Sequence, residues 1–113
     1  MSYNTRFSEY KIMWVMVFFD LPTETKKQRK DAAKFRKYLI EDGFTMFQYS
    51  IYVRHCSSKE NADTHQKRVS NKIPGDGKVC LMTITDRQFS EIKIFEGTAR
   101  VQPMPAAVQL ELF

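Results

Sequence analysis

The chain has 113 residues, with 18 Lys and Arg against 13 Asp and Glu, and a formal net charge of +5. This length allows one domain with a single modest core and excludes two, and the positive balance favours a polyanionic partner, most simply nucleic acid. Two cysteines imply no disulfide framework, and with no signal peptide or membrane-length apolar run in the sequence we expect no membrane partner and a cytoplasmic protein.

The first predicted element is a strand over about Ile12 to Asp20. Eight consecutive apolar residues, Ile12 to Phe19, are too few to cross a membrane and lack the alternation of a half-exposed strand, so we expect this strand to be buried on both faces. Asp20 then lies where the strand meets solvent, before the turn-forming Leu21-Pro22-Thr23. Such a carboxylate can bind a metal ion, or it can only bond the amides of the turn.

A basic helix is predicted next, from about Glu24 to Asp42, with Thr23 as its N-cap and Gly43 just past its end. Its inward stripe is Gln28, Ala32, Phe35 and Leu39. The opposite face gathers Lys26, Lys27, Lys30, Lys34 and Lys37. This face is either an ordinary solvated surface or a phosphate-binding one; only Asp31 interrupts the lysines, which favours phosphate.

The remaining predicted elements follow in chain order: one strand over 44–54, a helix from the Ser57 to Glu60 capping box to about Ile73, a strand over 78–85, a short helix opened by Thr85 to Gln88, a strand over 92–95, and a terminal strand over 108–113. The second helix has Ala62, Val69 and Ile73 at core spacing, and we expect His65 at its surface or boundary.

This order predicts an α+β domain with a ferredoxin-like sheet and helices on one face. That fold needs a hairpin between its second and third strands, whereas here a predicted helix falls between them. Because the first strand is apolar at every position, we expect a second copy to cover the other face, so that two sheets pack face to face in a homodimer. The terminal strand can add to the partner's sheet edge.

Strand 44–54 carries Gln48, Ser50, Tyr52 and Arg54 on one face, where they border the metal site or fill the dimer interface. Zinc is disfavoured, because His55, Cys56, His65 and Cys80 lack paired ligand spacing. A single-strand RNA-recognition sheet is also disfavoured, because strand 79–85 has no aromatic residue.

The ordered motifs resemble the Cas-two family, the small CRISPR-associated protein of the spacer-acquisition complex. The resemblance rests on Phe19-Asp20-Leu21-Pro22-Thr23, Arg36-Lys37-Tyr38-Leu39, Gly43, Gln48-Tyr49-Ser50-Ile51-Tyr52 and Thr85-Asp86-Arg87-Gln88-Phe89. It covers a core of about 12–95 within one domain of 1–113, flanked by an extension at 1–11 and the strand in 106–113. The Asp-Leu-Pro-Thr turn is most similar to members from type II systems.

The resemblance implies a homodimer that binds duplex DNA and bridges copies of the Cas-one integrase. It also implies, for some members, metal-dependent endonuclease activity on RNA or DNA, with Mg²⁺ or Mn²⁺ shared by two copies of the aspartate matched by Asp20. Many members have Tyr before that aspartate where this chain has Phe19, which removes a hydroxyl beside the metal.

These observations lead to one expected function and two alternatives. We expect a CRISPR adaptation scaffold on duplex DNA, with a phosphodiesterase centre at paired Asp20 and with nucleic-acid contacts from Lys26, Lys27, Lys30, Lys34, Arg36 and Lys37. The first alternative is a toxin-like, stand-alone endoribonuclease of the same fold, resembling the virulence-associated D family. The second is a structural adaptor that does not contact nucleic acid.

Overall fold

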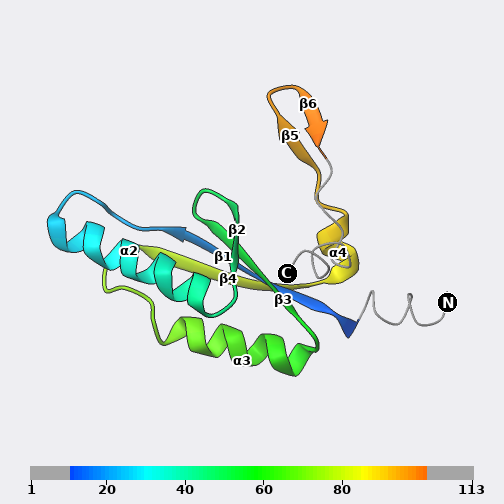
Figure 1. The fold of residues 1–113 in the computed structure, drawn as a ribbon, viewed down its shortest axis with the longest axis horizontal. Coiled ribbons are helices and arrows are strands. Elements are labelled where there is room, and N and C mark those ends of the chain that lie inside the picture. Colours follow the sequence, from blue (N-terminus) through cyan, green and yellow to red (C-terminus); the bar gives the residue numbers. More distant parts are fainter. Residues whose placement is uncertain (1–10, 102–113) are drawn as a thin grey trace.

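The computed structural model describes residues 11–101, and its helices and strands are drawn in Figure 1. In chain order they are β1 (Met13–Asp20), α2 (Lys26–Glu41), β2 (Thr45–Gln48), β3 (Ile51–Cys56), α3 (Lys59–Ser70), β4 (Lys78–Thr85), α4 (Asp86–Ser90), β5 (Ile94–Glu96) and β6 (Ala99–Val101).

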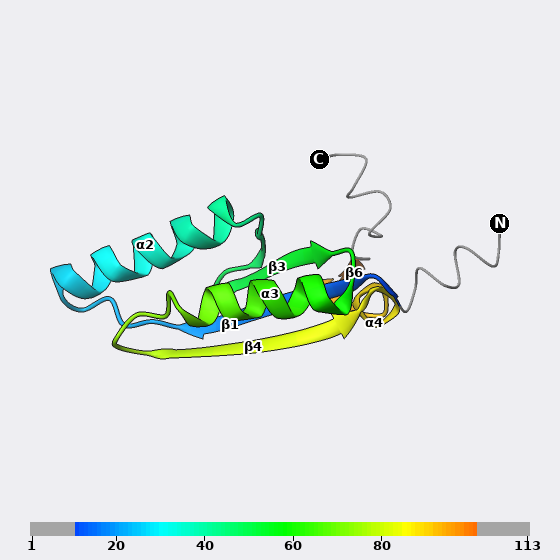
Figure 2. The same cartoon turned by 90° about the horizontal axis from the view of Figure 1, so that it is seen from below.

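Four strands form one antiparallel sheet in the order β2-β3-β1-β4. Helices α2 and α3 both lie on one side of this sheet, as Figure 2 shows. A β-α-β-β-α-β order with the first strand between the third and the fourth is the ferredoxin-like arrangement. The predicted α+β, ferredoxin-like fold is therefore confirmed.

The prediction of a single strand over 44–54 is wrong. The chain reverses at Tyr49 and Ser50, so that β2 and β3 form a hairpin, and Ser50 has a positive φ of 66°. The turn was missed because neither residue is a glycine or asparagine, the usual residues at such a position. The hairpin places the second helix after the third strand, as the fold requires.

The basic helix begins two residues later than predicted, because its N-cap is Thr25 and not Thr23. The Thr25 side chain accepts a hydrogen bond from the Gln28 backbone, and the Gln28 side chain accepts one from the Thr25 backbone. The predicted inward stripe is right for Ala32, Phe35 and Leu39, which are buried. Gln28 completes the capping box and is only half-buried.

Helix α3 departs from its prediction in three places. Its N-cap is Ser58, which accepts from the Asn61 backbone at 3.0 Å, so the capping pair is not Ser57 with Glu60. Ile73 lies beyond the helix end and is 41% exposed, whereas His65 is 4% exposed and belongs to the core side of the helix. The expected surface position of His65 is therefore wrong.

Alternate residues of β1 belong to two apolar clusters, one on each face of the sheet. Val15, Val17 and Phe19 pack under α2 and α3. Trp14 and Met16 pack on the opposite face, called the open face here, together with Phe89 of α4. The Phe89 ring stacks on Trp14 with ring centroids 4.0 Å apart, so α4 covers one end of this face within the chain.

The predicted strand over 92–95 is not part of the main sheet. It is replaced by β5, which pairs only with β6 in a separate two-stranded ribbon that projects away from the sheet in Figure 1. Most of the expected N-terminal extension and the expected strand over 108–113 lie outside the described residues. None of the helices described between residues 11 and 101 has the length and apolarity to cross a membrane.

Candidate nucleic-acid and metal site

Asp20 is the last residue of β1 and is exposed to solvent, as predicted. The neighbouring backbone is held firmly: the Phe19 N–H donates to the Ser50 carbonyl at 3.0 Å. On the other side, Asp20 lies opposite Lys78 in the β1–β4 register. The carboxylate is thus carried by a backbone that is fixed from both neighbouring strands.

The turn after Asp20 is fixed by an arginine that sequence reasoning did not single out. Arg29 of α2 donates from Nη1 to the carbonyls of Thr23 and Glu24, both at 3.0 Å. These bonds tie the loop between β1 and α2 to the helix itself. This role could not be predicted from the sequence, because Arg29 is one of many cations in a basic helix.

Gly77 permits the closest approach to this turn. It has a φ of +97°, and a Cβ at its position would lie 2.6 Å from the Asp20 carbonyl oxygen and 2.9 Å from atoms of Leu21 and Pro22. A side chain does not fit there, because the nearest atom belongs to backbone. The loop before β4 therefore packs directly on the Asp20 turn.

Phe19 anchors the end of β1 in the core beneath α2. Its ring meets Phe35 edge to face at 5.4 Å and lies 5.6 Å from the Tyr52 ring. The chain lacks a tyrosine hydroxyl at this position, and Phe19 is 6% exposed, so its contribution to the site is to hold the backbone of Asp20.

The hairpin separates Ser50 from Tyr52 and Arg54, which both lie on β3. Ser50 lies in the turn beside Phe19, and Tyr52 is buried under the helices. Arg54 donates from Nε to the Asp42 carbonyl at 2.8 Å and from Nη1 to the His55 carbonyl at 2.7 Å. Ser50 and the Tyr52 ring therefore lie beside Phe19 near the Asp20 end of β1, whereas Arg54 secures the end of α2.

The lysines of α2 form an exposed surface, called the basic face here and comprising Lys26, Lys27, Lys30, Lys34 and Lys37. Lys27 donates to Asp31 at 3.0 Å, and this hydrogen bond raises the pKa of the ammonium group. Because Asp31 is the single acid within this run, the other lysines keep their charge available to an anion.

Arg36 belongs to the same helix but points elsewhere. Its guanidinium lies 5.7 Å from the Phe19 ring centroid and 5.6 Å from that of Tyr49. It is half-buried between α2 and the β2–β3 turn. The structure therefore places Arg36 at the Asp20 end of β1 rather than among the outer lysines.

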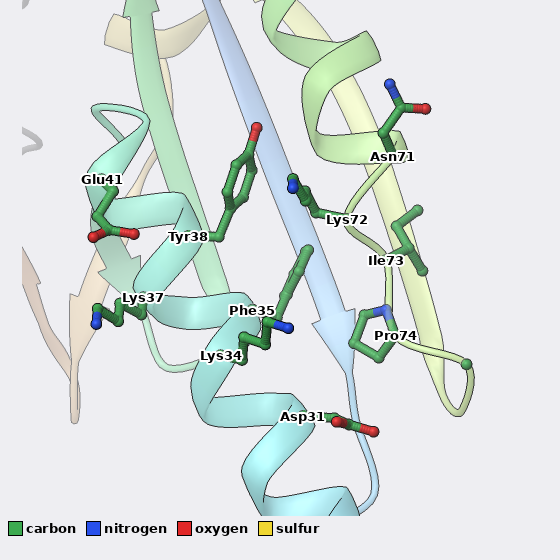
Figure 3. A pocket seen from close by; sticks show the side chains of 11 residues that line it. Asp31, Lys34, Phe35, Lys37, Tyr38, Glu41, Asn71, Lys72, Ile73 and Pro74 are labelled. Atoms are coloured by element: carbon green, nitrogen blue, oxygen red, sulfur yellow. The ribbon is translucent and has the colours of Figure 1, made fainter.

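A groove of about 570 Å³ runs between α2 and the connection from α3 to β4, with Phe35 and Tyr38 in its wall (Figure 3). Its charged residues are Asp31, Lys34, Lys37, Glu41 and Lys72. Lys72 lies over the Tyr38 ring with its Nζ 5.6 Å from the centroid. Burial and the nearby Asp42 raise the pKa of Tyr38, so its hydroxyl stays protonated. Sequence reasoning missed Lys72, because it follows α3 and shares no periodic face with the lysines of α2.

A second feature missed from the sequence is a polar cluster at the end of α2. The Asp42 carboxylate lies 2.8 Å from His65 Nδ1 and 3.3 Å from Arg68 Nη1. The negative charge of Asp42 is unfavourable next to the negative end of the helix dipole of α2. The contacts from His65 and Arg68 of α3 offset this cost. The cluster joins α2 to α3. None of its residues belongs to the Asp20 turn.

The donor chemistry at Asp20 fits a hard divalent cation, provided that other oxygens complete the shell. Across residues 11–101, no three His, Cys, Asp or Glu side chains converge in a way that could hold a metal ion. Mg²⁺ keeps several waters and is often bound by one or two carboxylates together with substrate phosphates. An exposed Asp20 from each of two protomers would satisfy that pattern.

Comparison with known proteins agrees with this reading of the fold. Residues 13–92 match the family described as CRISPR associated protein Cas2. A protein of Flavobacterium psychrophilum named CRISPR-associated endoribonuclease Cas2 is 52% identical over 112 residues, covering 99% of this chain and 97% of its own. Proteins of the same name from Parvibaculum lavamentivorans and Paracidovorax avenae are 54% and 40% identical, over 89% and 92% of this chain and 100% and 96% of their own. The chain therefore belongs to the CRISPR associated protein Cas2 family.

Proposed function

We propose that two copies of this chain form a nucleic-acid-binding scaffold for CRISPR adaptation, with a metal-dependent phosphodiesterase centre at paired Asp20. In this proposal the homodimer binds duplex DNA and bridges the Cas-one integrase of a type II system. The observation that carries it is the exposed Asp20 at the rigid end of β1, in the same domain as the exposed basic face of α2.

The pairing of protomers is supported by the uncovered part of the open face. Met82 lies opposite Met16 in the β1–β4 register and is 45% exposed. Cys80, opposite Phe18, is also exposed. These residues lead toward Asp20 and Lys78 at the same end of the sheet. A second copy packed on this apolar strip would bury it and bring the two Asp20 carboxylates toward each other.

Mg²⁺ or Mn²⁺ held by paired Asp20 would polarise a phosphoryl oxygen and lower the pKa of a bound water. The residues of the chain itself position the carboxylate: Arg29 and Gly77 fix its turn, and Phe19 fixes the strand end. We predict that Asp20→Asn abolishes metal-dependent cleavage and leaves duplex affinity within about twofold, because one exposed carboxylate makes no phosphate contact. Cleavage that persists in this variant would refute the catalytic role of Asp20.

Duplex binding is assigned to the basic face, with Lys72 at the rim of the groove as a further phosphate contact. Each phosphate contact that is lost lowers the salt slope of log K by about 0.9. Reversing charge at Lys30, Lys34 and Lys37 should therefore weaken duplex binding and flatten its salt dependence. The matched control reverses three exposed lysines elsewhere: Lys59, Lys67 and Lys93. If both triple variants lose the same duplex affinity, the loss comes from net charge alone, and this assignment is refuted.

A stand-alone endoribonuclease is the second candidate. The 52% identical relative is named CRISPR-associated endoribonuclease Cas2, which supports RNA as a substrate. Co-purification with an integrase distinguishes the two. The scaffold predicts a stable complex in which Asp20→Asn still supports spacer integration. The stand-alone enzyme predicts that no such complex forms and that RNA cleavage alone depends on Asp20.

A further inference from the structure

Tyr49 is the most exposed large apolar-bodied residue in the part of the chain that the structure describes, at 79% of its surface. It lies in the turn between β2 and β3, and neither the predicted fold nor the predicted site needs an aromatic ring there. A single exposed aromatic ring is common at a protein surface, so what distinguishes Tyr49 is how its ring is held.

One side of the Tyr49 ring is nevertheless held in place by Arg36. The Arg36 guanidinium lies 5.6 Å from the Tyr49 centroid, and its Nη2 is 3.5 Å from the Tyr49 hydroxyl. Arg36 is itself held over the Phe19 ring at 5.7 Å. Tyr49 is thus backed by a cation that is supported by a core residue, which restrains the ring while most of its surface stays open.

The turn that carries Tyr49 is also strained and tied to the strand that bears Asp20. Ser50 adopts a φ of 66°, a conformation that costs a serine energy and needs support from its surroundings. Its carbonyl accepts the Phe19 N–H at 3.0 Å. Phe18 lies opposite Ile51 in the β1–β3 register, so the turn that carries Tyr49 lies at the Asp20 end of β1.

We propose that Tyr49, backed by Arg36, is a stacking site for one unpaired base of a nucleic-acid strand whose backbone passes Asp20. The inference rests on the proposed phosphodiesterase centre, which it supplies with a residue that favours an unpaired strand over a duplex. A restrained and exposed aromatic ring can stack any base, and the adjacent guanidinium can donate to the phosphate of the same nucleotide. Bases inside a duplex are already stacked on each other and cannot use this site.

The test measures binding of the intact protein to a single-stranded RNA oligonucleotide and to a duplex DNA of equal length. A chelator is present, so that no cleavage occurs. We expect Tyr49→Ala to weaken single-strand binding about tenfold, the loss of one base–aromatic stack, with duplex affinity unchanged. Tyr49→Phe should keep the single-strand affinity, because the ring is retained. The control is Met46→Ala, which truncates a 58% exposed residue of the same hairpin that has no ring.

A second readout reports stacking directly. A 2-aminopurine base in the RNA should lose fluorescence on binding the wild-type protein and the Tyr49→Phe variant, and keep it with Tyr49→Ala. The inference is overturned if Tyr49→Ala binds the RNA as tightly as wild type, if Met46→Ala loses as much, or if wild type binds no single strand.

The two proposals fail separately in this design. Loss of cleavage in Asp20→Asn together with unchanged RNA binding in Tyr49→Ala would sink the stacking site alone. Base stacking that depends on Tyr49, with cleavage unaffected in Asp20→Asn, would sink the catalytic centre alone.

Discussion

Replacing Gly77 with alanine tests how tightly the Asp20 turn is built. A non-glycine residue at a φ of +97° costs about 1–3 kcal/mol in backbone strain. The added Cβ would also lie 2.6 Å from the Asp20 carbonyl oxygen, which belongs to backbone and cannot rotate away. Overpacking of this kind costs a further 1–3 kcal/mol, roughly. We therefore expect Gly77→Ala to lower the free energy of unfolding by about 2–6 kcal/mol.

Urea unfolding at one fixed protein concentration measures this loss, because a dimer's stability depends on concentration. The control is Gly75→Ala in the same loop, where a Cβ would meet nothing within 4 Å and φ is not positive. We expect that variant to unfold within about 0.5 kcal/mol of wild type, as surface substitutions usually do. Equal unfolding midpoints for Gly77→Ala and Gly75→Ala would refute the close packing of this loop on the Asp20 turn.

Two further predictions concern the histidines. His65→Ala should destabilise the protein by about 1–3 kcal/mol, because it leaves the Asp42 carboxylate, only 11% exposed, without its closest partner. Arg68→Ala should cost at most about 1 kcal/mol, since that side chain is 57% exposed; thermal unfolding that ranks the two variants the other way contradicts the assignment. Burial lowers the pKa of His55 below its ordinary 6.5, so the folded state favours the neutral ring, and stability should fall as pH drops through about 6.5. Denaturant unfolding of His55→Phe should show a weaker loss between neutral and acidic pH than wild type, and an identical pH profile would count against it.

The strands and helices with strong periodic signals could be predicted from the sequence. The apolar run of β1 and the Thr85 capping box both led to the right element in the right place. The basic face of α2 was also visible, because its lysines recur at helical spacing. The β2–β3 turn was not, since a serine at positive φ leaves no compositional signal and is stabilised by tertiary contacts such as the Phe19–Ser50 hydrogen bond.

The candidate site was foreseen in part for the same reason. Asp20 follows directly from the end of a buried strand, which is a local property of the sequence. The positions of Arg36 and Arg54 depend on side chains from other elements: Arg36 reaches the Phe19 and Tyr49 rings, and Arg54 reaches the end of α2. The Asp42–His65 pair joins residues 23 positions apart on two helices, and no spacing rule predicts it.

The self-association of the intact chain tests the central claim most directly, because the proposed pairing of Asp20 requires two protomers. Sedimentation equilibrium across a wide dilution series should give twice the 13.3 kDa mass of one chain. Met82→Lys, which places a charge on the exposed apolar strip of the open face, should shift the protein to monomer while it stays folded. A wild-type chain that sediments as a folded monomer throughout the series would contradict the account.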